Sequence, residues 1–142
     1  MRVSLFVTCL ADQLWPAAGV GAVEVLRRVG CAVEFDERQT CCGQPAFNTG
    51  YRPEACSLAR RLIEIFESSG ADAIVSPSGS CTAMLHHYEQ LFEDAGWRAR
   101  ARSRAPSQSG AVASAACRRS PNKVVAWRKA PRSCPSASAA RA

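Results

Sequence analysis

Three short apolar segments, each followed by a helical pattern, constrain the fold of this chain most strongly. Strand-length runs of apolar and β-branched residues occur over residues 3–8, 31–35 and 71–75. Helical patterns follow them over residues 16–30, 53–69 and 82–95. Strands that alternate with helices in this way are typical of a parallel sheet with right-handed crossovers. We therefore predict the α/β class, with an open β-α-β-α-β-α parallel sheet.

Four of the eight cysteines follow the predicted strands. They are Cys9 after the first strand, the adjacent pair Cys41 and Cys42 after the second, and Cys81 after the third. The carboxyl ends of parallel strands meet at one edge of a sheet, and ligands bind at that edge in open α/β folds. We therefore expect these four cysteines to converge.

The adjacent cysteines point to metal binding. Two neighbouring cysteines cannot close an ordinary disulfide with each other without distorting the peptide between them. Gly43, which follows them, permits a tight backbone turn with positive φ. On such a turn, Cys41 and Cys42 can both face one polynuclear metal centre, with Cys9 and Cys81 as the remote ligands.

Four converging thiolates suit either a cubane [4Fe-4S] cluster or a tetrahedral zinc ion. Structural zinc sites use close cysteine pairs, and this sequence contains no CxxC. The long spacings therefore favour an iron-sulfur cluster, and zinc remains the alternative. The small residues 76–80 are expected to supply N–H and hydroxyl groups near the sulfur atoms.

The remaining cysteines and the two histidines have simpler interpretations. Cys31 and Cys56 lie on or beside regular elements without a partner at ligand spacing, so we expect small buried hydrophobic residues. His86 and His87 are expected at the surface of the third helix rather than as ligands.

The charge distribution divides the chain. Residues 1–97 hold all 12 acidic residues and 7 of the 18 basic ones, a formal charge of −5. Residues 98–142 hold the other 11 basic residues and no acid. We predict a folded module over 1–97 and a low-complexity basic tail over 98–142, either disordered or the product of a shifted reading frame. Its charges are scattered, so nucleic-acid binding is not expected.

Several other classes of protein are disfavoured. No run approaches the roughly 20 apolar residues of a membrane span. The pair Gly19 and Gly21 has Glu24 in place of the third glycine of a dinucleotide-binding loop. The predicted helices do not suit a small secreted disulfide scaffold, so we expect a reducing cytoplasmic location.

Three separated segments resemble one known family. SLFVTC at 4–9, QTCCGQPAFNTG at 39–50 and PSGSCTAM at 77–84 are similar, in order and spacing, to the cysteine-rich CCG-domain family. The resemblance is closest to its lactate-utilisation branch, with relatives among the iron-sulfur subunits of glycolate oxidase and heterodisulfide reductase. It covers about residues 1–100.

The resemblance implies an iron-sulfur electron carrier within an oxidoreductase complex, in this branch one that oxidises L-lactate to pyruvate. By motif, Cys9, Cys41, Cys42 and Cys81 fall on the family's ligand positions, and no catalytic residue is implied. The fuller heterodisulfide reductase motif ends in a further cysteine, where this sequence has Met84. A four-thiolate site is therefore expected.

The resemblance also implies partners. Other subunits of a lactate-oxidising complex should supply the substrate site. The family module is duplicated, whereas one copy is found in this sequence, so we expect self-association through the surface that a second module would cover. The alternatives are a zinc-binding interaction module and a truncated, non-functional remnant of the iron-sulfur protein.

Overall fold

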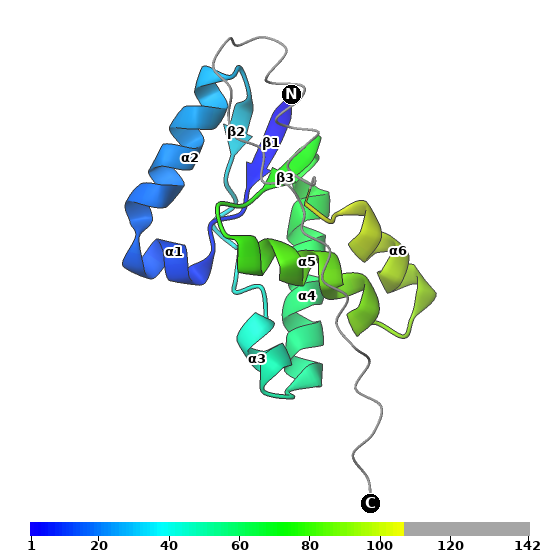
Figure 1. The fold of residues 1–142 in the computed structure, drawn as a ribbon. Helices are drawn as coiled ribbons and strands as arrows, with labels where there is room; N and C mark the ends of the chain where they lie inside the picture. The colour runs from blue at the N-terminus through cyan, green and yellow to red at the C-terminus, as the bar shows by residue number, and fades with distance from the viewer. Residues whose placement is uncertain (107–142) are drawn as a thin grey trace, which may run out of the picture.

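The computed structural model describes residues 1–106, and its order of elements confirms the predicted α/β class (Figure 1). Three parallel strands form one sheet in the order β2-β1-β3. The strands are β1 (Arg2–Leu5), β2 (Ala32–Glu34) and β3 (Ala73–Val75). Val3 pairs with Val33 on one side and with Ala73 on the other, so β1 is the central strand.

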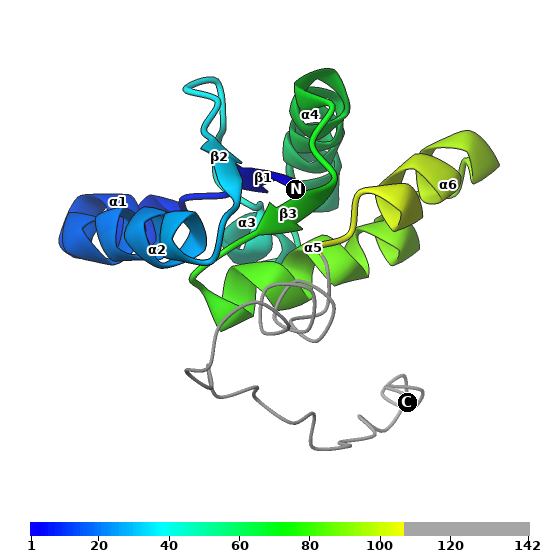
Figure 2. The ribbon, with the colours of Figure 1, turned by 90° about the horizontal axis from the view of Figure 1, so that it is seen from above.

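Helices cover both faces of the sheet (Figure 2). They are α2 (Pro16–Arg28) on one face, and α4 (Arg52–Ser69) and α5 (Gly79–Leu91) on the other. Because successive side chains of a strand point to opposite faces, Val3 and Leu5 join the core beneath α2, whereas Phe6 joins the core beneath α4 and α5. This burial on both sides explains why the first strand is a continuous apolar run in the sequence.

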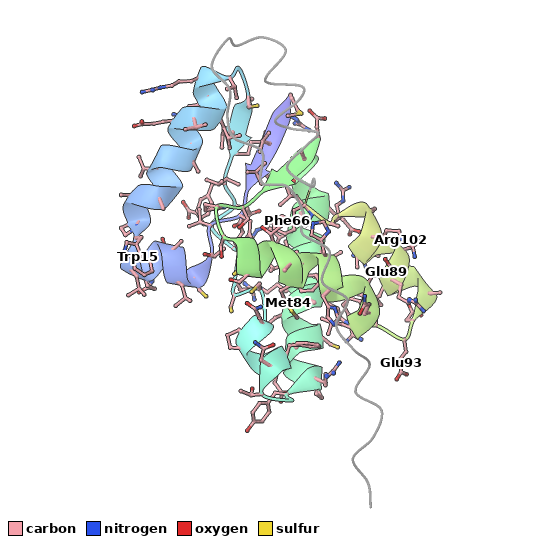
Figure 3. The ribbon with its side chains drawn as sticks, in the orientation of Figure 1. Trp15, Phe66, Met84, Glu89, Glu93 and Arg102 are labelled. Carbon is pink, nitrogen blue, oxygen red and sulfur yellow. The ribbon has the colours of Figure 1, made fainter. Side chains whose placement is uncertain are left out.

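The larger core lies between the sheet and helices α4 and α5. The rings of Phe6 and Phe66 meet edge-to-face with centroids 5.7 Å apart. Phe66 and Met84, labelled in Figure 3, are both buried in this core. Cys42 and Cys81 belong to the same cluster of buried residues. Two of the four candidate ligands therefore form part of the hydrophobic core.

A short helix that the sequence pattern did not predict follows the first strand. Helix α1 (Cys9–Leu14) starts three residues after β1, which is shorter than the strand expected over 3–8. Thr8 caps it, because its side-chain oxygen accepts a hydrogen bond from the backbone N–H of Ala11 at 3.4 Å. A helix of six residues is too short to show a periodic apolar pattern.

The loops that follow β2 and β3 are also more ordered than expected. Helix α3 (Gln44–Asn48) lies within the segment expected to be a loop, and it starts directly after Gly43. Helix α5 begins at Gly79, three residues before the predicted start. Cys81 therefore lies in the first turn of a helix rather than in the preceding loop.

Helix α6 (Ala95–Ser103) crosses the expected boundary between module and tail at residue 97. Asp94 caps this helix by accepting a hydrogen bond from the backbone N–H of Trp97 at 2.9 Å. Two ion pairs attach it to the rest of the fold: Arg100 with Glu67 of α4, and Arg102 with Glu89 of α5 (Figure 3). The ordered region thus continues past 97 because the first basic residues of the predicted tail meet acidic partners.

The rest of the predicted tail, with Cys117 and Cys134, lies in residues 107–142, outside the described residues. The division into a module over 1–97 and a tail over 98–142 remains a prediction, as does the shifted reading frame. Among the helices of residues 1–106, none combines the length and the apolar character needed to cross a membrane.

Candidate metal centre

The four candidate cysteines meet at the carboxyl edge of the sheet. Cys9 is the first residue of α1, after β1. Cys41 and Cys42 lie in the loop that follows β2, and Cys81 lies in the first turn of α5, after β3. The convergence expected from the order of strands and helices is therefore found in the structure.

The thiols form two contacting pairs. The Sγ atoms of Cys9 and Cys41 are 3.6 Å apart, and those of Cys42 and Cys81 are 3.3 Å apart. None of the four is in a disulfide, in which the sulfur atoms would be about 2.05 Å apart. Each member of the adjacent pair thus contacts a different remote cysteine.

The two pairs differ in depth. Cys42 is 2% exposed and Cys81 is 8% exposed, whereas Cys41 is half-buried and Cys9 is exposed. The site therefore runs from the core, at the inner pair Cys42–Cys81, to the surface, at the outer pair Cys9–Cys41.

Gly43 turns the chain immediately after the adjacent cysteines. Its φ is 79°, in the left-handed region, as the sequence predicted. A Cβ atom at this position would lie 3.4 Å from the carbonyl oxygen of Ala55 on α4. The glycine is required for both reasons, because a side chain would strain the turn and push the Cys42 loop away from α4.

Tyr88 fixes the inner pair from below. Its hydroxyl group donates a hydrogen bond to the backbone carbonyl of Cys42 at 2.8 Å, within the core. Burial raises the pKa of this phenol, and the nearby thiols of Cys42, Cys41 and Cys81 raise it further. Tyr88 was predicted as a buried helix residue but not as part of the site. Its position two turns after Cys81 on α5 is the signal that could have identified it.

The two inner thiols differ in acidity. The Cys42 thiol donates a hydrogen bond to Cys81, which raises the pKa of Cys42, and burial raises it further. The same hydrogen bond lowers the pKa of Cys81, and hydrogen bonds from Ser78, Ser80 and Thr8 lower it too, against the opposing effect of burial. Cys81 is thus the thiol that the fold prepares to carry negative charge.

Backbone amides face two of the sulfur atoms. The N–H of Leu10 hydrogen-bonds Cys9, and the N–H of Gln44 hydrogen-bonds Cys42, each favouring the thiolate. Burial nevertheless raises the pKa of Cys9 overall, together with the neighbouring Cys41. Donors of this kind stabilise thiolates bound to a metal.

Comparison with known protein families agrees with this geometry. The cysteine-rich domain family named CCG matches residues 3–86, which include all four cysteines of the site. The chain belongs to the CCG family. No solved structure matches it.

Curated relatives of this CCG domain are named lactate utilization protein A. The protein from Halalkalibacterium halodurans is 53% identical over 103 residues, covering 72% of this chain and 41% of the relative. The protein from Shouchella clausii is 55% identical over 102 residues, covering 71% and 42%. That from Bacillus subtilis is 52% identical over 94 residues, covering 66% and 39%. The chain thus spans about two fifths of the length of these relatives.

The donor set of the CCG domain fits a thiolate-bound metal centre in its chemistry. Within residues 1–106, no three Cys, His, Asp or Glu side chains surround one point, because the thiols contact each other in pairs. In a tetrahedral zinc site with Zn–S bonds of 2.3 Å, two sulfur atoms would be about 3.8 Å apart, close to the separations within the pairs. A cluster that places one thiolate on each iron requires the members of each pair to move apart.

Two polar atoms beside the cysteines lack a partner. The Thr40 hydroxyl and the side-chain oxygen of Gln39 are buried and make no hydrogen bond in the structure. The amide nitrogen of Gln39 donates to the carbonyl of Leu5 at 2.9 Å, which ties the loop to the end of β1. Buried polar groups are nearly always paired, so these atoms favour a further polar group at this edge. Sequence reasoning gave neither residue a role.

The residues predicted to lie outside the site do so. Cys31 is buried beneath α2, and Cys56 is half-buried with its sulfur 3.5 Å from the carbonyl oxygen of Leu91. His86 and His87 are half-buried rather than exposed. The ring of His87 meets that of Phe47 at 4.9 Å between centroids, which accounts for its burial.

Proposed function

We propose that this CCG domain is an iron-sulfur electron-transfer module of an oxidoreductase complex, with Cys9, Cys41, Cys42 and Cys81 as the ligands of one cluster. The observation that supports this most is the meeting of four thiols, from three separate segments, at one edge of the sheet. A cubane [4Fe-4S] cluster uses four thiolates, so the donor count agrees.

The role in lactate oxidation is part of the same proposal. The relatives are named for lactate utilization, and the chain matches about two fifths of their length. A cluster supplies one-electron transfer when it is bound, and a partner subunit would bind the substrate. A reducing cytoplasmic location, where thiols stay free to bind metal, agrees with this role.

The residues of the chain would stabilise and tune such a cluster. The hydroxyls of Ser78, Ser80 and Thr8 hydrogen-bond Cys81, so they stabilise negative charge on its sulfur. The amides of Leu10 and Gln44 act in the same way on Cys9 and Cys42. Hydrogen bonds to the sulfur atoms are one of the means by which a protein sets a cluster's reduction potential.

The partner would approach the outer pair. Cys9 is exposed, and Leu10, Leu14 and Trp15 next to it are large apolar side chains that are also exposed, Trp15 to 66%. Trp15 lies at the junction of α1 and α2, on the outer side of the molecule (Figure 3). Exposed apolar patches of this kind mark interaction sites. We assign this surface to a partner subunit or, in the isolated chain, to self-association.

The second candidate function is a structural zinc module that uses the same thiols. The close sulfur separations within each pair favour it, and the absence of CxxC opposes it.

Optical and EPR spectroscopy separate the two. The chain would be reconstituted anaerobically with iron and sulfide and then reduced with dithionite. The iron-sulfur proposal predicts a broad visible absorption that bleaches on reduction and a paramagnetic signal in the reduced sample. A colourless protein that retains zinc would establish the structural module instead.

A further inference from the structure

The outer cysteine pair is placed to form a reversible cross-link. The Sγ atoms of Cys9 and Cys41 are 3.6 Å apart, so they need to approach by only about 1.6 Å to reach bonding distance. The two residues come from different loops, so their bridge avoids the strain of one between neighbouring residues.

Both partners have room to make this approach. Cys9 is exposed and opens α1, a helix in which no residue is buried. Cys41 is half-buried in a segment without regular secondary structure. Small rotations of the two side chains, with a small shift of α1, would therefore not disturb the core.

The inner pair is held differently. Cys42 and Cys81 lie in the core, at 2% and 8% exposure, out of reach of a dissolved oxidant. Cys42 is anchored through its backbone carbonyl by Tyr88, and Cys81 belongs to the first turn of α5. The two pairs are thus a protected one and an accessible one.

We propose that, in the metal-free chain, Cys9 and Cys41 form a disulfide when the chain meets a small-molecule disulfide oxidant. The Cys9 thiolate attacks one sulfur of the oxidant, which breaks the oxidant's S–S bond and releases one thiolate. The Cys41 thiolate then attacks the Cys9 sulfur and releases the second. Two electrons pass from the protein to the oxidant, and the two protons of the protein thiols end on the two released thiols.

The disulfide has a consequence for metal loading, which rests on the proposed function. Metal ligands must be free thiolates, and the bridge removes two of the four. The oxidised chain would therefore have to be reduced before it could take up a cluster. The inner pair would meanwhile remain as thiols.

Peptide mapping tests the cross-link directly. The full chain, with Cys117 and Cys134 changed to Ser, is freed of metal, treated with glutathione disulfide, blocked with iodoacetamide and digested with trypsin. The expected product is a linked peptide pair joining Cys9 to Cys41, with loss of two hydrogens from the intact mass and loss of iodoacetamide labelling at both residues. Full labelling of Cys9 after oxidation, or a link from Cys9 to Cys42, would overturn the proposal.

Two variants sharpen the result. In Cys41→Ser, the glutathione adduct on Cys9 should persist, because no thiol remains in contact to resolve it. Cys31→Ser, which changes a buried cysteine outside the site, should give the same cross-link as the parent chain. If Cys41→Ser released the adduct as fast as the parent, a different thiol would be the partner and the proposal would fail.

Metal uptake then separates this proposal from the proposed function. The oxidised chain should bind several-fold less iron than the reduced chain, and dithiothreitol should restore uptake. Equal uptake by a chain whose Cys9–Cys41 bridge is verified would overturn the loading consequence. If neither state bound iron, the proposed function would fail, and the mapped cross-link would still decide the disulfide.

Discussion

The Sγ atoms of Cys42 and Cys81 lie 3.3 Å apart, although the two residues are 39 positions apart in the sequence. Their contact joins the loop after β2 to the first turn of α5 inside the hydrophobic core. The inner half of the site is therefore built by the same packing that stabilises the fold. Changes that loosen this packing should affect the thiols, and the first predictions concern the groups that hold them.

Removal of the Tyr88 hydroxyl should destabilise the fold. Tyr88→Phe leaves the buried carbonyl of Cys42 without the hydrogen bond that the phenol donates. The expected loss in the free energy of unfolding is about 1–2 kcal/mol. Urea unfolding followed by circular dichroism measures it. Tyr51→Phe is the matched control, because Tyr51 is 61% exposed and its change should cost less than about 0.5 kcal/mol. Equal stability of the two variants would contradict this role of Tyr88.

Gly43 and Gly21 should respond in opposite ways to alanine. Gly43→Ala forces a side chain into left-handed backbone beside α4, at a cost of about 1–2 kcal/mol. Gly21→Ala, within helix α2 and with no atom near the added methyl group, should stabilise by about 0.5–1 kcal/mol. Thermal unfolding of both variants gives the comparison. A neutral Gly43→Ala would show that the turn after the cysteines is not constrained as described.

The ion pair between α6 and α4 should depend on pH in a defined direction. A hydrogen bond from Arg100 lowers the pKa of Glu67 from its ordinary value of 4.5. Because the folded-state pKa is depressed, the pair stabilises the fold above pH 4.5, and this stabilisation disappears as the pH falls through the lower folded value.

The variant Glu67→Gln tests this dependence. It should be less stable than the parent at pH 7 and should match it once the pH is low enough to protonate Glu67. Urea unfolding at both pH values measures the difference. Glu93→Gln, at an exposed position labelled in Figure 3, should show no such change. A destabilisation by Glu67→Gln that stays constant with pH would contradict the ion pair.

The sequence predicted the sheet and the location of the site because both follow from the order of the elements. Cysteines that follow parallel strands must converge, whatever the details of packing. Helices α1 and α3 escaped prediction because they have six and five residues, and α6 because contacts with Glu67 and Glu89 support it.

The pairing of the thiols could not be read from the sequence. Whether Cys41 contacts Cys9 or Cys81 depends on the turn at Gly43 and on how Tyr88 anchors the Cys42 carbonyl. These are contacts between residues far apart in the chain, and they carry no local pattern.

The serine loop should set the reduction potential if the cluster is present. Ser78→Ala with Ser80→Ala removes two hydrogen bonds that favour negative charge on Cys81. The potential of the reconstituted cluster should fall, because the reduced, more negative state loses more stabilisation than the oxidised state. An optical redox titration measures the shift. Ser57→Ala, at an exposed position on α4, is the control. An unchanged potential in the double variant would contradict the role of these hydroxyls.

The central claim, that the four converging cysteines hold an iron-sulfur cluster, is tested most directly by metal content. The full chain and two double variants would be purified anaerobically, and iron, acid-labile sulfide and zinc would be measured per chain. The parent and the control Cys31→Ser, Cys56→Ser should each contain about four iron and four sulfide, and the variant Cys41→Ser, Cys42→Ser should contain neither. About one zinc without sulfide, or iron that persists in the Cys41→Ser, Cys42→Ser variant, would contradict the account.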